Sequence, residues 1–295
     1  MNRFESSFKP IKKYLSTYLL GIAALLGGAS PAFAAGAPSL GTASDFAVLS
    51  AAPGGLGAVT CTDSTITGNV GSSGQPASVV QTSCPISGAI IAPVSAQVLT
   101  DFNGAYNALA GQSCDSFLTG TLAGVTLAPG VYCFSAAATL TGTLTLAGSS
   151  TDTWLFKIGT SGTGALTGTN FSVVMANGAS ACNVTWWVAE AATMTTSDFK
   201  GTILAGAAIT STGVAPTSPY EGRALAKAAV TLTNVAFVGC TSGSIGGTAK
   251  RKCNQGVGNG PEGCDPGNSN QGNPFRSNDE RGGVPGNPGR KGGNK

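Results

Sequence analysis

Apolar and small polar residues alternate in short runs between residues 118 and 239, and glycine or Ser, Thr and Asn turns separate the runs. Alternation with a period of two is the pattern of a β-strand that is buried on one side. Similar runs recur at intervals of about 20 to 30 residues, which is the repeat length of a solenoid coil. An earlier stretch that begins near Ser44 has the same pattern, so we expect it to join the same solenoid.

Three kinds of run follow one another along the chain, which predicts coils with three faces. The first kind is mainly apolar and occupies residues 131–134, 154–157, 186–189, 202–205 and 223–226. The second kind carries threonines and occupies residues 138–141, 165–167, 192–195, 208–210 and 229–233. The third kind is clearest at residues 143–147, 171–175 and 235–238. Because repeats of this length stack on their neighbours, the pattern predicts a mostly β, right-handed, three-faced parallel β-solenoid.

The second kind of run directs its threonines to one side of the strand. Alternation turns residues such as Leu140, Met194 and Ile209 inward and the threonines outward. Ten threonines are candidates for a binding surface: Thr60, Thr62, Thr139, Thr141, Thr167, Thr193, Thr195, Thr210, Thr231 and Thr233. We expect two gaps, because residues 165–169 keep fewer threonines in register and Ala208 replaces one in the next coil. A slip of one residue would turn this ladder inward.

Residues 93–110 form the one segment after the first 34 residues that has the pattern of an amphipathic helix. Pro93 in the first turn and Gly111 after the last turn mark its two ends. We expect this helix to pack along one face of the solenoid. The preceding residues 63–91 are expected to form a capping loop.

The first 34 residues have the three parts of an export signal peptide. Basic residues between Arg3 and Lys13 precede an apolar run at residues 14–28, and Ala34 ends a small-residue cleavage motif. The apolar run is short for a bilayer span, and no longer one follows it. We therefore predict a secreted protein with residues 35–249 as its folded domain and with no membrane span after cleavage.

Eight cysteines and no histidine in an exported chain favour disulfides over metal or thiol chemistry. Many pairings are open to eight cysteines. Sequence order suggests Cys61 with Cys84, Cys114 with Cys133, Cys182 with Cys240, and Cys253 with Cys264.

Charged residues make up only 10% of the chain, and they divide it into two regions. Residues 36–249 carry four basic and eight acidic side chains, whereas residues 250–295 carry eight basic and four acidic ones. This tail is rich in Gly, Asn and Pro, so it cannot bury a core and we expect it to be disordered. No nucleic-acid partner is expected, because no basic residues gather in the predicted folded region.

The acidic residues of the predicted domain are scattered over turns and the helix, and the chain has no nucleophile elbow, phosphate loop or metal-ligand run. Glycoside hydrolysis, a reaction found on other parallel β-helices, usually needs a pair of facing carboxylates. We therefore expect no catalysis, no cofactor and no metal site.

Several longer motifs occur in a fixed order between residues 40 and 240. They are LGTASDFAVL at 40–49, TGNVG at 67–71, LAPGVYCF at 127–134, ACNVTWWV at 181–188 and GRALA at 222–226. In this order they resemble the bacterial and fungal ice-binding proteins of the discontinuous β-solenoid type. The resemblance implies a long helix along a three-faced solenoid, N-terminal and C-terminal coils that meet out of sequence order, and a flat face that binds ice.

The threonine runs match that face best. The resemblance therefore predicts a secreted protein that adsorbs to the ice crystal surface without turnover. The alternative is an extracellular adhesin or structural surface protein without ice activity, attached to the cell through residues 250–295.

Overall fold

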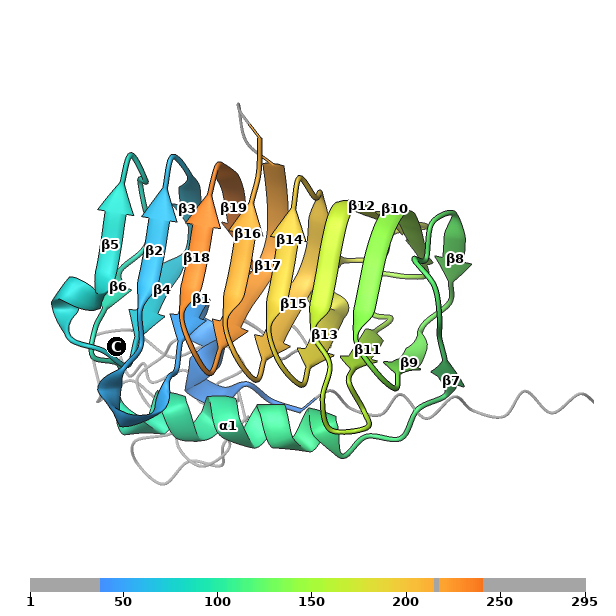
Figure 1. Cartoon of the computed structure of the whole chain (residues 1–295), viewed down its shortest axis with the longest axis horizontal. Coiled ribbons are helices and arrows are strands. Elements are labelled where there is room, and N and C mark those ends of the chain that lie inside the picture. The colour runs from blue at the N-terminus through green and yellow to red at the C-terminus, as the bar shows by residue number, and fades with distance from the viewer. Residues whose placement is uncertain (1–37, 215–217, 241–295) are drawn as a thin grey trace, which may run out of the picture. The chain divides into compact units, whose positions relative to one another are not determined.

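The computed structural model describes residues 38–214 and 218–240. In these residues the chain winds into stacked coils of parallel strands, with one α-helix along the stack (Figure 1). The predicted fold class, a mostly β, three-faced parallel solenoid with one packed helix, is confirmed. The predicted signal peptide and the predicted tail lie outside the described residues.

The first face is a parallel sheet against which the helix packs. Its strands, in spatial order, are β6 (Ile90–Ile91), β4 (Asn69–Ser72), β1 (Phe46–Ser50), β17 (Ser218–Ala226), β15 (Phe199–Ala205), β13 (Val184–Val188), β11 (Trp154–Ile158), β9 (Gly130–Phe134) and β7 (Ser116–Phe117).

The second face is an eight-stranded parallel sheet that contains the threonine runs. Its strands, in spatial order, are β5 (Val79–Thr82), β2 (Val59–Thr62), β18 (Val230–Thr233), β16 (Ile209–Thr212), β14 (Ala192–Thr195), β12 (Leu166–Ala176), β10 (Ala138–Ala147) and β8 (Val125–Leu127).

A third face closes each coil. β3 (Thr65–Thr67) pairs with β19 (Val235–Gly239), which pairs with the first half of β17. Further along the stack, β10 and β12 continue from the second face into the third, and Ser172 of β12 forms a bridge to Asp198 beside β15. Within the described ranges, four short 3-10 helices lie in the connections: Gly41–Asp45, Pro53–Gly55, Pro76–Ser78 and Ala181–Asn183.

The stacking order departs from the sequence order where the two ends of the domain meet. β1 lies between β4 and β17, β2 pairs with β18, and β3 pairs with β19. In Figure 1 the blue strand β2 lies beside the orange strand β18. The Ser50 hydroxyl donates to the carbonyl of Ala228, 178 residues later, at 2.7 Å. The solenoid is therefore discontinuous, as the resemblance implied.

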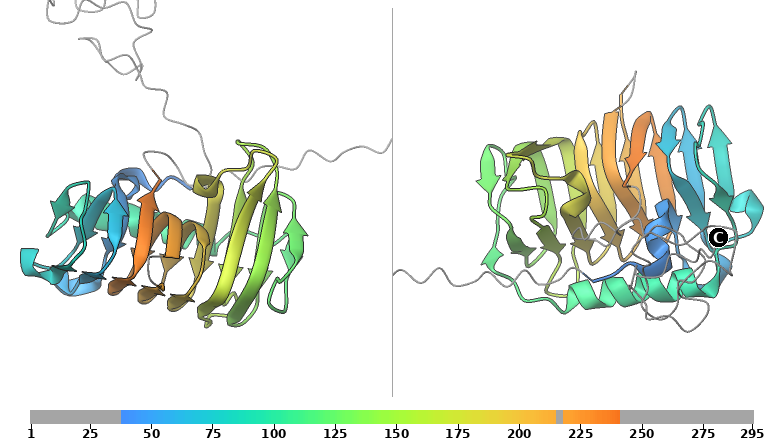
Figure 2. Two further views of the ribbon diagram at one scale, coloured as in Figure 1. Left: turned by 90° about the horizontal axis from the view of Figure 1, so that it is seen from above. Right: turned by 180° about the vertical axis from the view of Figure 1, so that it is seen from behind.

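Helix α1 (Ala96–Ala110) runs along the first face, as the view from behind in Figure 2 also shows. It buries Val98, Phe102, Ala105, Tyr106 and Leu109 in a second core cluster that includes side chains of the sheet. The Tyr106 hydroxyl donates to the carbonyl of Val188 at 3.0 Å. Burial of these apolar side chains, each contributing roughly 1.5–3 kcal/mol, holds the helix on the sheet.

The helix begins three residues later than the sequence predicted. Pro93 is not in its first turn, because the chain is still extended at Ser95, which occupies the N-cap position. The amide of Val94 donates to the carbonyl of Ser72 at 2.8 Å, so this stretch is tied to β4 before the helix starts.

The prediction of a capping loop at residues 63–91 was wrong. These residues contain β3, β4, β5 and β6, and they add a further coil at the end of the stack. β5 pairs with β2 from Val59↔Val79 to Thr62↔Thr82, so the backbone groups of β2 are paired on both sides. The apolar alternation is weak here because this end coil covers the core from one side only.

A row of aromatic rings fills the interior. Neighbouring ring centroids lie 4.0–5.6 Å apart along Tyr132, Phe156, Trp186, Phe199, Tyr220 and Phe237. Such contacts add to the stability that burial alone supplies.

Three of the four suggested disulfides are present: Cys61–Cys84, Cys114–Cys133 and Cys182–Cys240. The fourth suggested pair, Cys253 with Cys264, lies outside the described residues.

Candidate functional site

The second face presents two columns of threonines, which we call the threonine face. Strands β2, β18, β16, β14, β12 and β10 each contribute the sequence Thr-X-Thr. The first column is Thr60, Thr231, Thr210, Thr193, Thr167 and Thr139. The second column is Thr62, Thr233, Thr212, Thr195 and Thr169, with Thr141 following beside a shift of register between β10 and β12. The structure thus brings together all ten threonines that the sequence singled out.

Two members of the threonine face, Thr169 and Thr212, were missed by the sequence reasoning. Both are in register, because Thr195 of β14 pairs with Thr169 on one side and with Thr212 on the other. The expected gaps were therefore wrong. Ala208 does not take a threonine position, since it precedes the inward residue Ile209. The repeated Thr-X-Thr was the signal that would have found both residues.

The side chains of the threonine face point away from the core. All twelve are partly or fully exposed, whereas the residues between and before them are buried, and Leu140, Met194 and Leu232 are at most 1% exposed. None of the twelve hydroxyls has a hydrogen-bond partner among the described residues. These hydroxyls are therefore available to water.

The geometry of the sheet makes the threonine face a regular grid. Residues two apart on a strand lie about 6.6–6.8 Å apart, and strands in neighbouring coils lie about 4.7–4.9 Å apart. The branched Cβ of threonine restricts χ1, so the hydroxyl and methyl positions are set in advance. No titratable group belongs to the grid.

A sharp corner bounds the second column on one side. The residue after the second threonine has a positive φ in five of the six strands: Asp63, Gly142, Asn170, Thr196 and Asn234. Asn, Asp and Gly adopt this left-handed conformation more readily than other residues. The chain turns here into the third face, so the flat area ends at the second column.

The third face is mixed in character. Lys200 Nζ lies 2.8 Å from Asp198 Oδ1 and 3.9 Å from Glu221 Oε2. Val174 and Val238 are exposed on the same face. The two carboxylates are thus engaged by one ammonium group between them, and they do not form a free acid and base pair.

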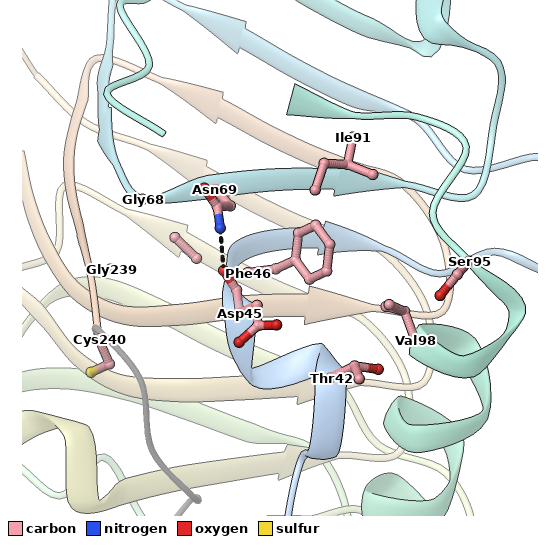
Figure 3. Close-up of a pocket in the computed structure, with 11 residues that line it drawn as sticks. Thr42, Asp45, Phe46, Gly68, Asn69, Ile91, Ser95, Val98, Gly239 and Cys240 are labelled. Atoms are coloured by element: carbon pink, nitrogen blue, oxygen red, sulfur yellow. Dashed lines mark hydrogen bonds between the residues drawn. The ribbon is translucent and has the colours of Figure 1, made fainter. Parts of the chain in front are cut away.

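A hollow lies at the junction of the first 3-10 helix, β4, β6 and the start of α1 (Figure 3). Its lining combines apolar Phe46 and Ile91 with the carboxylate of Asp45, and Asn69 Nδ2 donates to the Asp45 carbonyl at 2.9 Å. In the described part of the chain, no group of three or more His, Cys, Asp or Glu residues is placed to hold a metal ion. This hollow involves no residue of the threonine face.

Two buried cations serve the fold. Lys157 Nζ donates to the carbonyls of Ala110, at 2.8 Å, and Gln112, so it caps the C-terminal end of α1. Desolvation lowers the pKa of Lys157. Burial lowers the pKa of Arg223 to about 10, against an opposing effect of the Asp45 charge. Arg223 Nε donates to the carbonyl of Ser44 at 3.3 Å, which ties β17 to the N-terminal coil.

The family model described as "Ice-binding-like" matches residues 40–238. The chain belongs to this family. The match covers both the N-terminal and the C-terminal coils, and it therefore includes every strand of the threonine face.

Curated relatives carry the same description. "Ice-binding protein K1-A" of Typhula ishikariensis is 35% identical over 220 residues, which are 65% of this chain and 86% of that protein. An "Ice-binding protein" of Nostoc sp. (strain HG1) is 39% identical over 203 residues, which are 66% of this chain and 72% of that protein.

Solved structures share the fold. The ice-binding protein from the Antarctic ascomycete Antarctomyces psychrotrophicus has a TM-score of 0.59 and 30% identity, covering 70% of this chain and 99% of that one. The corresponding domain of Shewanella frigidimarina ice-binding protein_1 has a TM-score of 0.61 and 26% identity, covering 70% of this chain and 98% of that one.

Proposed function

We propose that this chain is an ice-binding protein that adsorbs to ice through the threonine face. The observation that carries the proposal is the pair of threonines on each of six neighbouring strands, in register at every position but Thr141. Membership of the ice-binding-like family supports it. The twelve hydroxyls support it as well, because they have no hydrogen-bond partner in the part of the chain that the structure describes and can bind water there.

Adsorption by this face needs no chemical step. The hydroxyls hold water at fixed positions, and the methyl groups between them order that water into a layer that can merge with the crystal. Because threonine is already restricted at χ1, little side-chain entropy is lost on binding. Ice between adsorbed molecules then grows as a curved front, whose local freezing point is lower, so growth stops.

The test is thermal hysteresis of the mature protein at micromolar concentration. Thr195→Tyr and Thr231→Tyr place a large ring in the middle of the threonine face, and we expect each to abolish hysteresis while the thermal melting curve stays the same. Thr65→Tyr and Thr143→Tyr, on the third face, are the matched controls and should keep full activity. Hysteresis that survives at the first two positions would assign ice binding to another face.

We also propose that the protein acts outside the cell. The pattern of residues 1–34 supports export. The three disulfides support it, because such bonds persist in oxidising compartments. Separately from that support, the described residues contain no helix with the combined length and apolar character of a membrane span. Mass spectrometry of protein from the culture medium should find a mature N-terminus at Ala35, and an intact Met1 would contradict the proposal.

Attachment to the cell surface through residues 250–295 is a separate proposal. The change from an acidic domain to a basic, Gly-rich segment supports a distinct role for these residues. Deletion of residues 250–295 should release cell-bound protein and leave hysteresis unchanged. If the wild-type protein folds but shows no hysteresis, the adhesin or structural role takes first place.

A further inference from the structure

The core layer directly beneath four neighbouring strands of the threonine face, β10, β12, β14 and β16, alternates in side-chain size. Each strand turns two residues inward, one before the first threonine and one between the two threonines. The pairs are Ala138 and Leu140 in β10, Leu166 and Gly168 in β12, Ala192 and Met194 in β14, and Ile209 and Ser211 in β16. In each of these four pairs one residue is small and the other large, and the order reverses from each strand to the next. The alternation ends at β18 and β2, which turn Val230 with Leu232 and Val59 with Cys61 inward.

Gly168 and Met194 show how closely the layer is packed. The two residues pair across β12 and β14, and a Cβ added at Gly168 would lie 2.7 Å from the sulfur of Met194. The methionine therefore occupies the space that a side chain at residue 168 would need. Met194 is 1% exposed, so it cannot leave this space without entering another part of the core.

The alternation gives each of the four strands nearly the same inward volume, one large and one small side chain. In a close-packed core, extra volume under one strand must be accommodated by a shift of side chains or backbone. Equal volume under neighbouring strands removes the reason for any one strand to be pushed outward. The threonines on the opposite side of those strands then share one level.

We propose that this small-to-large alternation, centred on Gly168 and Met194, positions the threonine pairs of β10, β12, β14 and β16 in one plane and so makes them competent to adsorb to ice. The proposal rests on the function proposed above and names positioning residues for the same face. Ice is a rigid, flat partner, so a displaced strand would break contact across the whole grid, whereas a soft partner could adapt to it.

The test is overpacking by Gly168→Leu in the full mature chain. Residue 168 is not in the left-handed region, so the backbone accepts leucine and the change is one of volume. We expect hysteresis per folded molecule near 0 °C to fall about threefold or more, because the added volume displaces β12 or β14. Circular dichroism at the same temperature checks that the variant is folded.

Two further variants separate positioning from stability. Ala205→Leu overpacks the core beneath the first face, where Ala205 is fully buried, and should lower the melting temperature without changing hysteresis per folded molecule. Met194→Ala combined with Gly168→Leu returns the volume and should restore most of the hysteresis.

The outcomes distinguish failure of the positioning role from failure of the proposed ice-binding function. An active wild type with an equally active, folded Gly168→Leu variant would overturn the positioning role alone. A double variant that folds but stays as inactive as Gly168→Leu would contradict the volume argument. A folded wild type without hysteresis would overturn the proposed function, and this inference with it.

Discussion

The threonine face and the third face are two exposed surfaces of the same coils, yet they are composed differently. On the second face, strands β2, β18, β16, β14, β12 and β10 all repeat Thr-X-Thr, and no charge interrupts the grid. On the third face only β3 and the second half of β10 have threonine pairs, and the coils between them present Ala236 and Val238, Pro219 and Glu221, Asp198 and Lys200, and Ser172 and Val174. A solvated β surface tolerates such variety, so solubility alone does not require the uniform threonine face.

The two faces also differ in what lies beneath them. Large rings, including Phe171, Phe199, Tyr220 and Phe237, fill the core under the third face, and each is at most 1% exposed. Side chains without rings fill the core under the threonine face, and they alternate in size beneath β10, β12, β14 and β16. The large buried rings that stabilise the coil therefore lie under the third face, whereas the regular surface is the threonine face.

A charged side chain placed on the threonine face should reduce hysteresis more than any other single change. We expect Thr210→Lys to lower hysteresis about tenfold or more, because an ammonium pressed against ice loses water that nothing replaces. Val174→Lys, at an exposed position of the third face, should leave hysteresis unchanged. Equal losses from the two variants, measured at matched concentration, would mean that the faces are not functionally distinct.

Removal of a core ring should separate stability from activity. Phe237→Ala should lower the free energy of unfolding by about 3–5 kcal/mol, since it opens a cavity under the third face. Below the melting transition, the hysteresis of the folded variant should match that of the wild type. Denaturant titration and a hysteresis assay on the same sample provide both values.

Loss of a single hydroxyl should lower hysteresis on the threonine face but not on the third face. Thr212→Val and Thr169→Val keep the shape of the side chain and remove one bound water each, so we expect hysteresis to fall about twofold for each change. Thr67→Val on the third face is the matched control and should have no effect. Wild-type activity in both variants would exclude Thr169 and Thr212 from the surface that contacts ice.

The smallest effects should come from pH. Since the threonine face has no titratable group, hysteresis should be constant from about pH 4 to about pH 9. A dependence on pH within that range would assign a charged residue to the contact surface.

Stability, in contrast, should decline in alkali. Burial raises the pKa of Tyr106 to about 12 and raises the pKa of Tyr220 well above its usual value. An unfolded tyrosine ionises near pH 10, so the stabilisation is complete below that pH and is lost as the pH rises towards 12. For Tyr106 this loss is about 1 kcal/mol at pH 11. Burial lowers the pKa of Lys157 and Lys227, which adds stability with rising pH and opposes the decline only up to the pKa of a free lysine.

The alkaline decline can be assigned by substitution. Tyr106→Phe removes one ionising group, so its unfolding free energy should fall less steeply between pH 10 and pH 12 than that of the wild type. Equal slopes for the two proteins in chemical denaturation would exclude Tyr106 as a source.

The sequence predicted the strands that alternate and the ladder that they carry, because a period of two is a local property of the chain. It did not predict the register, since Thr169 and Thr212 join the grid only through pairing with Thr195. Gly168 made one run look irregular, although a missing side chain at that point is what Met194 requires.

The end coil at residues 63–91 was misread for a related reason. Its strands are short and cover the core from one side, so they carry little alternation, and only pairing with β2 and β4 identifies them. The start of the helix was predicted three residues too early. Proline marks a boundary of a helix, but it does not fix on which side of the proline the first turn begins. The hydrogen bond from Val94 to Ser72 places that boundary, and it joins residues from different elements.

The pairing of β2 with β18 has a consequence for the order of events in folding. The rung that holds Thr60 and Thr62 is made early in synthesis, but its partner holds Thr231 and Thr233 and is made near the end of the domain. High sequence separation between contacting residues slows folding. The full length of the grid therefore cannot form before the last coil has been synthesised, because a ribosome-bound fragment without that coil lacks β18, the strand that joins β2 to β16.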